Sequence, residues 1–296
     1  MDNPLLDSVS RYADAHADPA GFAQTPIAGL AVVRHSVPTG LEYTVYQPAV
    51  CLVLQGSKHV AMGTRAFDFH AGDTLLITAD VPTVSQVTRA TAAQPYYSLV
   101  LDLDLSLVAE LAVEMTQVSA GGGAALQVEP TDADVAEAAL RLMQLLERPA
   151  SIPVLQAQRV REMHYWLLAG RHGDAIRRLG WPDGVMQRVT RAVALLNQQY
   201  TQPLPVEQLA ATAGMSPSSF YQHFRAVTSL SPLQFQKQLR LIEARRRMVS
   251  EGQSASTAAF AVGYESVSQF TREYHRMFGR PPAQDSAAMR EAAMPG

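Results

Sequence analysis

The sequence predicts an α+β protein: an N-terminal β-sandwich or jelly roll, a helical linker and an all-α C-terminal domain. Three observations carry this prediction. Short β-rich segments separated by turn residues occupy residues 30–105, helical spacings of apolar residues dominate after residue 125, and one helical pattern occurs twice near the end of the chain. We therefore expect four regions, at residues 1–125, 126–183, 184–202 and 203–290.

Eight candidate strands follow an amphipathic segment at residues 5–20. Turn signals such as Pro38-Thr39-Gly40 and Ala71-Gly72-Asp73 separate them. Strands of this length and spacing predict an antiparallel sandwich or barrel of the jelly-roll kind, which can enclose a small ligand. The candidates are Leu30–His35, Leu41–Tyr46, Val50–Gln55, Lys58–Met62, Ala66–His70, Thr74–Thr78, Thr83–Thr88 and Tyr96–Leu103.

The helical region begins after Gly121-Gly122-Gly123. These glycines lack the Lys-Ser/Thr of a phosphate-binding loop, so we interpret them as a joint. Apolar residues three and four apart predict helices over Asp132–Glu147 and Ile152–Leu168. Gly170–Gly184 is predicted as a polar break, and a further helix runs from Val185 to about Tyr200.

The charge is distributed unevenly along the chain. Residues 1–180 carry 12 Lys/Arg and 19 Asp/Glu, whereas residues 203–296 carry 10 and 7. A basic C-terminal part behind an acidic part suits a domain that meets phosphates. Cys51 is the only cysteine, which excludes an intrachain disulfide and suits a reducing compartment. With no signal-peptide pattern and no apolar run of roughly 20 residues, we expect a cytoplasmic protein away from the membrane.

Residues 204–225 have the pattern of two short helices joined by a tight turn. Pro205 favours a helix start, Gly214 suits a turn residue with positive φ, and Ser216 is a typical helix cap. Phe220 and Phe224 lie four residues apart and are expected to face inward. Four side chains then remain on the outer face of the second helix: Ser218, Tyr221, Gln222 and Arg225.

The same pattern recurs 49 residues after Gly214, at Gly263. Ser266 is the expected cap, Phe270 and Tyr274 face inward, and Val267, Ser268, Gln269 and Arg272 face outward. A helix from about Pro232 to Ser250 connects the two copies, with Phe235, Leu239 and Ile242 inward. Its arginines, Arg245–Arg247, either form a solvated face or contact phosphates. A single such stretch is often only a helical hairpin, but two copies with matching glycines and caps indicate two helix-turn-helix units, whose recognition helices can enter successive major grooves of DNA.

This region resembles the AraC/XylS family of transcription regulators. The resemblance is carried by Gly214-Met215-Ser216, Phe220 and Phe224, Ser231-Pro232, and Gly263-Tyr264-Glu265-Ser266 with Phe270, Tyr274, Phe278-Gly279 and Pro282. It implies base contacts by Ser218, Tyr221 and Gln222 in the first unit and by Val267, Ser268, Gln269 and Arg272 in the second. We count Arg225 and Arg276 with them as DNA-binding residues. The sequence departs from the family pattern after Pro282, where Ala283-Gln284-Asp285 replaces an aromatic-Arg pair.

The N-terminal part is similar to the cupin-like domain of one AraC-type subfamily, on the strength of the segments Pro48–Gly56 and Ala71–Ile77. Some cupins are metal enzymes, which need a His-x-His pair, a Glu and a later His. Here His59 and His70 are isolated and no such set exists, so we expect no metal, no cofactor and no catalytic residue. Cys51 lies in an apolar run and is expected to be core packing; an electrophile-sensing thiol is the alternative.

Together these features predict a regulator of transcription that binds promoter or operator DNA and responds to a small-molecule effector in its N-terminal domain. The family resemblance implies that the helices at 132–147 and 152–168 form a homodimer; otherwise they pack on their own domain. RNA polymerase is a further expected partner. The competing hypothesis is a cupin-type enzyme or small-molecule binding protein whose helical tail only oligomerises.

Overall fold

The computed structural model describes residues 3–115, 125–180 and 184–293. The glycines 121–123 and the segment Trp181–Asp183 lie outside these residues. The chain divides into two compact units, Met1–Arg188 with Ala226–Ser229, and Val189–Arg225 with Leu230–Gly296. No helix in the described part of the chain is long and apolar enough to cross a membrane.

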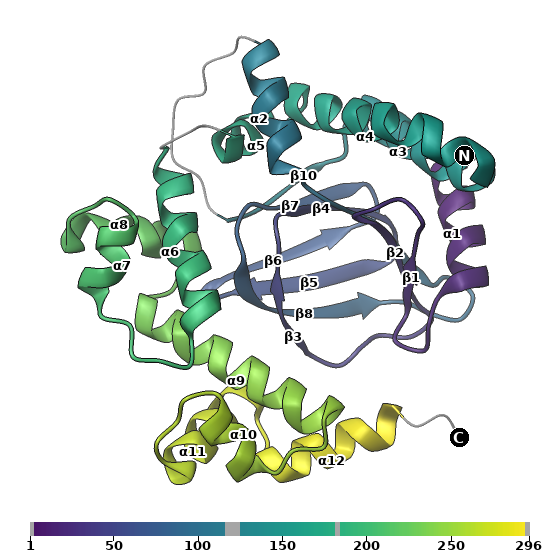
Figure 1. The fold of residues 1–296 in the computed structure, drawn as a ribbon. Helices are drawn as coiled ribbons and strands as arrows, with labels where there is room; N and C mark the ends of the chain where they lie inside the picture. Colours follow the sequence, from purple (N-terminus) through teal and green to yellow (C-terminus); the bar gives the residue numbers. More distant parts are fainter. Residues whose placement is uncertain (1–2, 116–124, 181–183, 294–296) are drawn as a thin grey trace. The chain divides into compact units, whose positions relative to one another are not determined.

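The first unit contains two antiparallel sheets (Figure 1). The six-stranded sheet has the order β1-β2-β9-β4-β7-β10, and the four-stranded sheet has the order β3-β8-β5-β6. The strands are β1 Phe22–Gln24, β2 Leu30–His35, β3 Glu42–Tyr46, β4 Ala49–Gln55, β5 Ser57–Met62, β6 Arg65–His70, β7 Asp73–Ile77, β8 Val81–Arg89, β9 Tyr96–Asp102 and β10 Leu126–Pro130.

All eight predicted strands are present, because alternating apolar residues and Gly- or Pro-containing turns define them locally. Two strands were missed. Strand β1 has only three residues, which is too short to show a period. Strand β10 follows the glycines and pairs with β7, Leu126 opposite Ile77. The sheet therefore continues past residue 125, where the sequence suggested that the β-domain ends.

Five helices complete the first unit: α1 Pro4–His16, α2 Leu105–Glu114, α3 Ala133–Leu146, α4 Ile152–Ala169 and α5 Gly173–Gly180. Helix α1 packs against β2 and β9 of the six-stranded sheet, and α3 packs against α1 and α4 (Figure 1). The interpretation of Gly170–Gly184 as a polar break is wrong for α5, which buries Ala175, Ile176 and Leu179. Helix α5 spans only about two turns. The spacing of its apolar residues is therefore too short to stand out among the polar residues of this segment.

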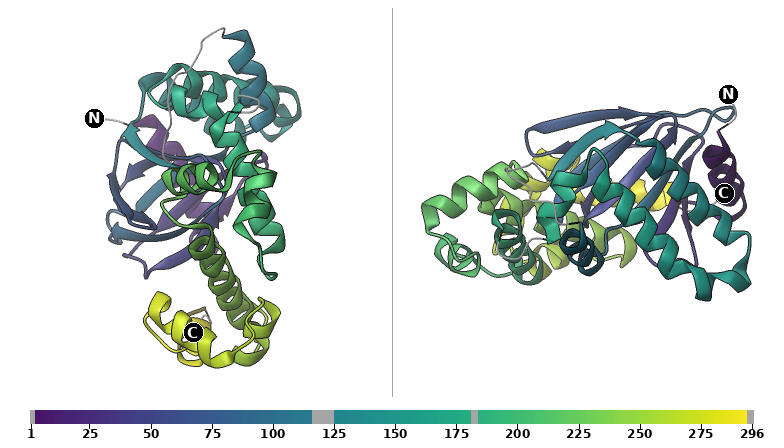
Figure 2. Two further views of the ribbon diagram at one scale, coloured as in Figure 1. Left: turned by 90° about the vertical axis from the view of Figure 1, so that its left-hand side faces the viewer. Right: turned by 90° about the horizontal axis from the view of Figure 1, so that it is seen from above.

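The second unit is entirely helical in its described residues. The helices are α6 Val185–Gln199, α7 Val206–Thr212, α8 Pro217–Thr228, α9 Pro232–Ser250, α10 Ala255–Ala261, α11 Val267–Phe278 and α12 Pro282–Ala293. In the left view of Figure 2, α9 runs as one long helix from the α7–α8 group to the α10–α12 group. Most of α6, which the sequence suggested as a linker helix, clusters with this unit from Val189 onward.

Candidate nucleic-acid interface and sandwich interior

The first helix-turn-helix unit consists of α7 and α8. Gly214 has φ of 61°, a left-handed conformation that favours glycine, and the Ser216 hydroxyl accepts a hydrogen bond from the Ser219 backbone at 3.3 Å. Phe220 and Phe224 are fully buried with their rings 5.3 Å apart. Packing of this aromatic pair fixes which face of α8 is turned outward.

The second helix-turn-helix unit, α10 and α11, repeats this design. Ser266 caps α11 by accepting from the Gln269 backbone at 3.3 Å, and Phe270 and Tyr274 are fully buried. Gly263 has φ of 87°, and a Cβ there would lie 1.9 Å from the Thr201 carbonyl oxygen. Only glycine allows this approach of the turn to the segment that precedes α7.

The nine predicted DNA-binding side chains lie on the outer faces of α8 and α11. Eight are exposed; Val267 is half-buried. Arg225, Arg272 and Arg276 form no ion pair with any carboxylate among the described residues, so their guanidinium groups are available to a partner. Gln269 is less free, because its amide donates to Glu273 at 3.2 Å.

The three arginines near the end of α9 have carboxylate partners. Arg245 binds Asp285, Arg246 binds Glu243 and Glu251, and Arg247 binds Glu243. The pair with Asp285 makes Arg245 a structural link between α9 and α12, whereas Arg247 pairs within α9 and Arg246 stays exposed. Phosphate contact by this run stays a prediction. Ile242 is only half-buried; Leu241 and Ala244 fill the core instead.

A set of hydrogen bonds from α9, which we call the α9 clasp, connects the segment before the first helix-turn-helix unit to the turn of the second. Arg240 donates to the carbonyls of Tyr200 at 2.6 Å, Gly263 at 2.9 Å and Gln202 at 3.2 Å. Gln236 donates to the same Tyr200 and Gln202 carbonyls, at 3.0 and 2.6 Å. The clasp holds the segment before α7 and the turn before α11 to one rigid helix. Sequence reasoning missed it, because its acceptors are backbone atoms.

The sandwich interior holds a group of polar side chains from both sheets. We call it the inner cluster: Tyr46, Cys51, Lys58, Ser85, Tyr96 and Ser98. Lys58 donates to the Tyr46 hydroxyl at 3.2 Å, and Tyr46 lies 3.4 Å from the Ser85 hydroxyl. Burial raises the pKa of Cys51, although nearby Lys58 acts in the opposite direction, so the thiol is protonated at neutral pH.

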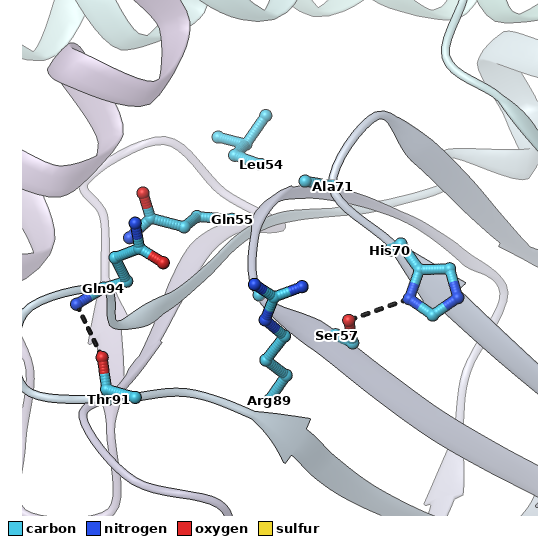
Figure 3. A pocket seen from close by; sticks show the side chains of 9 residues that line it. Leu54, Gln55, Ser57, His70, Ala71, Arg89, Thr91 and Gln94 are labelled. Carbon is cyan, nitrogen blue, oxygen red and sulfur yellow. Dashed lines mark hydrogen bonds between the residues drawn. The ribbon is translucent and has the colours of Figure 1, made fainter.

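The two histidines considered as metal ligands are engaged elsewhere. His59 bonds to Asp68 at 2.8 Å and His70 to Ser57 at 2.8 Å. Within residues 3–115, 125–180 and 184–293, no three His, Cys, Asp or Glu side chains gather as a possible metal site. His70 instead lines an open pocket of about 380 Å³, and the guanidinium of Arg89 lies between the side chains of Gln55 and Ser57 in this pocket (Figure 3).

Comparisons with known proteins agree with this architecture. The family model "AraC-type transcriptional regulator N-terminus" matches residues 26–175, and the model "Helix-turn-helix domain" matches residues 209–287. The virulence regulon transcriptional activator VirF of Yersinia enterocolitica is 28% identical over 148 residues, 48% of this chain and 52% of that protein. The RCS-specific HTH-type transcriptional activator RclR of Escherichia coli K12 is 38% identical over 88 residues, 30% of this chain and 31% of that protein.

The chain thus matches about half of VirF and a third of RclR. Among solved structures, ToxT from Vibrio cholerae bound to (E)-4-(8-methylnaphthalen-1-yl)but-3-enoic acid has a TM-score of 0.55 at 10% identity, over 88% of this chain and 98% of that one. This likeness confirms the fold, a β-sheet domain followed by a helical region. Because the N-terminal model alone covers half of the sequence, the chain belongs to the family of AraC-type transcriptional regulators.

Proposed function

We propose that this protein is a sequence-specific DNA-binding regulator of transcription whose activity depends on a small-molecule effector. One observation carries the proposal: two capped recognition helices, α8 and α11, present arginines without carboxylate partners, and the α9 clasp joins them. A major groove admits one helix, and successive grooves on one face of DNA are about 34 Å apart. Two linked helices can therefore bind one long asymmetric site.

Base contacts are assigned to the outer faces of α8 and α11. In α8 they are Ser218, Tyr221, Gln222 and Arg225; in α11 they are Val267, Ser268, Gln269, Arg272 and Arg276. Arginine suits guanine and glutamine suits adenine, whereas the half-buried Val267 can contact a thymine methyl group. We assign the protein to the cytoplasm as part of this proposal, because its DNA target would lie there.

The experiment is a titration of the full chain against DNA from upstream of its own and neighbouring genes, with a shuffled duplex as the control. Fluorescence anisotropy at several salt concentrations measures both affinities. We expect one upstream segment to bind about a thousandfold or more tightly than the shuffled duplex, with affinity falling as salt rises. Equal affinity for every duplex would contradict sequence-specific recognition.

The effector is assigned to the first unit, where the inner cluster offers hydroxyl, thiol and ammonium groups between two sheets. ToxT, which has a similar fold, was solved with a small organic molecule bound. To act as a switch, an effector must bind two states of the protein with different affinities. The protonated Cys51 favours reversible binding over covalent capture, since the thiolate is the reactive form.

A second copy of the chain and RNA polymerase complete the proposed partners. Helix α4 exposes the apolar side chains of Val154 (68%), Leu155 (39%) and Tyr165 (40%), a surface that a homodimer would bury. Light scattering of the wild type and of Val154→Asp tests this surface. We expect a dimer for the wild type and a shift toward monomer for the variant; identical masses would contradict the assignment of α4.

A further inference from the structure

A row of side chains in the middle of the six-stranded sheet keeps accessible surface. Ala31, Val100 and Cys51 lie opposite one another on β2, β9 and β4, so their side chains share one face. All three keep accessible surface, although Val50 and Leu52 beside Cys51 are fully buried. Cys51 and Lys58 each affect the pKa of the other, so Lys58 on β5 lies near this row. These three side chains therefore keep surface that a ligand placed against the row can contact.

Lys58 of β5 is a half-buried cation. Its only hydrogen bond goes to the Tyr46 hydroxyl, and it forms no ion pair with a carboxylate among the described residues. Glu42 shares the same face of the four-stranded sheet, and its carboxylate accepts from Ser85 at 3.5 Å. An ammonium has three N–H donors, and lysines are almost never buried unpaired. Two of its donors are thus free for another acceptor.

Tyr96 supplies a second, independent sign of a missing partner. Its side chain is fully buried on β9, on the same face as Cys51 and Ser98. These two neighbours lie close enough to affect the pKa of the Tyr96 hydroxyl, but neither reaches full hydrogen-bond geometry with it. Buried hydroxyls are nearly always satisfied, because an unmade hydrogen bond costs free energy. An acceptor between Lys58 and Tyr96 would satisfy both groups.

We propose that Lys58 binds the carboxylate of a small organic acid between the two sheets, and that such an acid is the effector. The inference rests on the proposed function and specifies the chemical class of the effector. Tyr46 orients the ammonium, Tyr96 donates the second hydrogen bond, and the row Ala31, Val100 and Cys51 contacts the apolar body of the ligand. The pKa of Lys58 is raised by Tyr46, Cys51 and Glu42 despite its burial, so the amine stays charged and suits an ion pair rather than an imine.

The test measures binding of straight-chain acids, from acetate to octanoate, to the full chain without DNA. Each acid is paired with the primary alcohol of the same length. Calorimetry and saturation-transfer NMR give the affinities. We expect at least one acid to bind and its alcohol to bind about 10- to 100-fold more weakly. Lys58→Met should lower the affinity for the acid by a similar factor, whereas Lys58→Arg should retain it within a few-fold.

Arg89 provides the matched control. It is the cation of the open pocket in Figure 3, and it also lacks a carboxylate partner among the described residues. Arg89→Met should leave acid binding unchanged. If Arg89→Met abolishes binding while Lys58→Met does not, if acid and alcohol bind equally, or if no acid in the series binds, the proposal is wrong. If Lys58→Met fails to fold, the proposal is tested by acid binding to Lys58→Gln and by the comparison of acid and alcohol binding to the wild type. DNA affinity is measured separately, so failure here leaves the DNA-binding proposal intact.

Discussion

Arg245 of α9 and Asp285 of α12 form a two-point ion pair inside the second unit: Arg245 Nε lies 2.8 Å from Asp285 Oδ2, and Nη2 lies 3.0 Å from Oδ1. Both side chains are largely buried, and the Tyr274 hydroxyl donates to the same carboxylate at 2.7 Å. Asp285 is one of the residues at which the sequence departs from the family pattern. It therefore ties α12 to both α9 and α11.

Replacing Asp285 with Ala should destabilise the second unit by about 3–5 kcal/mol, because the largely buried Arg245 charge loses its carboxylate. Chemical denaturation followed by circular dichroism measures the loss. In the double variant Arg245→Met/Asp285→Leu, neither charge remains, and most of the stability should return. A double variant as unstable as Asp285→Ala would show that the charge is not the cause.

Replacing Arg272 with Ala should cost about 1–3 kcal/mol of binding free energy on the specific DNA site and much less on random DNA. The reason is the loss of base contacts from an exposed guanidinium that no carboxylate holds. Arg246→Ala is the control, since Arg246 is exposed but paired with Glu243 and Glu251. Equal losses on both duplexes would identify Arg272 as a phosphate contact.

Replacing Arg240 with Met should weaken binding to the complete site about tenfold or more, while binding to each half-site changes little. Without the clasp, the two helix-turn-helix units are no longer held in one geometry, and binding loses preorganisation. Anisotropy with full and half-site duplexes separates these effects. A proportional loss on all three duplexes would indicate general unfolding instead.

The first unit should lose stability as the pH falls from 7 to about 5.5. His164 accepts from the Asp104 backbone at 3.0 Å and donates from Nδ1 to Val160 at 2.8 Å, which fixes its neutral form, and burial lowers the pKa values of His164 and His172. The unfolded chain takes up protons near pH 6.5 where the folded chain does not, so unfolding becomes easier below that pH.

Trp166 of α4 reports this unfolding by fluorescence. His164→Gln should flatten the pH dependence by up to about 1.4 kcal/mol per pH unit, since one titrating group is removed. His275→Gln is the control, because His275 is exposed on α11 of the other unit. If both variants keep the slope of the wild type, His164 does not cause it.

Replacing Cys51 with Ala should retain the response to the true effector, with a small loss of affinity from the missing apolar contact, and cost some stability. The thiol is protonated and packs as a small apolar group. Effector-dependent DNA binding by Cys51→Ala and Cys51→Ser measures the response. If both variants fold but neither responds, covalent sensing at Cys51 replaces the reversible mechanism.

Local sequence determined most of the secondary structure and the outer faces of α8 and α11. Eight strands, the capped helices and the inward aromatic pairs follow from periods of two or about 3.6 residues and from turn and cap residues, which act over a few positions. The pairing of Phe220 with Phe224, and of Phe270 with Tyr274, sets the exposed face without reference to distant segments.

Tertiary structure decided what depends on residues far apart in the chain. Strand β10 exists because β7 offers an unpaired edge, and α5 because its short apolar face is buried. Arg245 on α9 gains its structural role from Asp285, 40 residues away in the chain. The α9 clasp depends on backbone carbonyls, which no pattern of side chains in the sequence can reveal. Lys58, Tyr96 and Cys51 come together only when two sheets face each other, since packing, not spacing, brings their strands into contact.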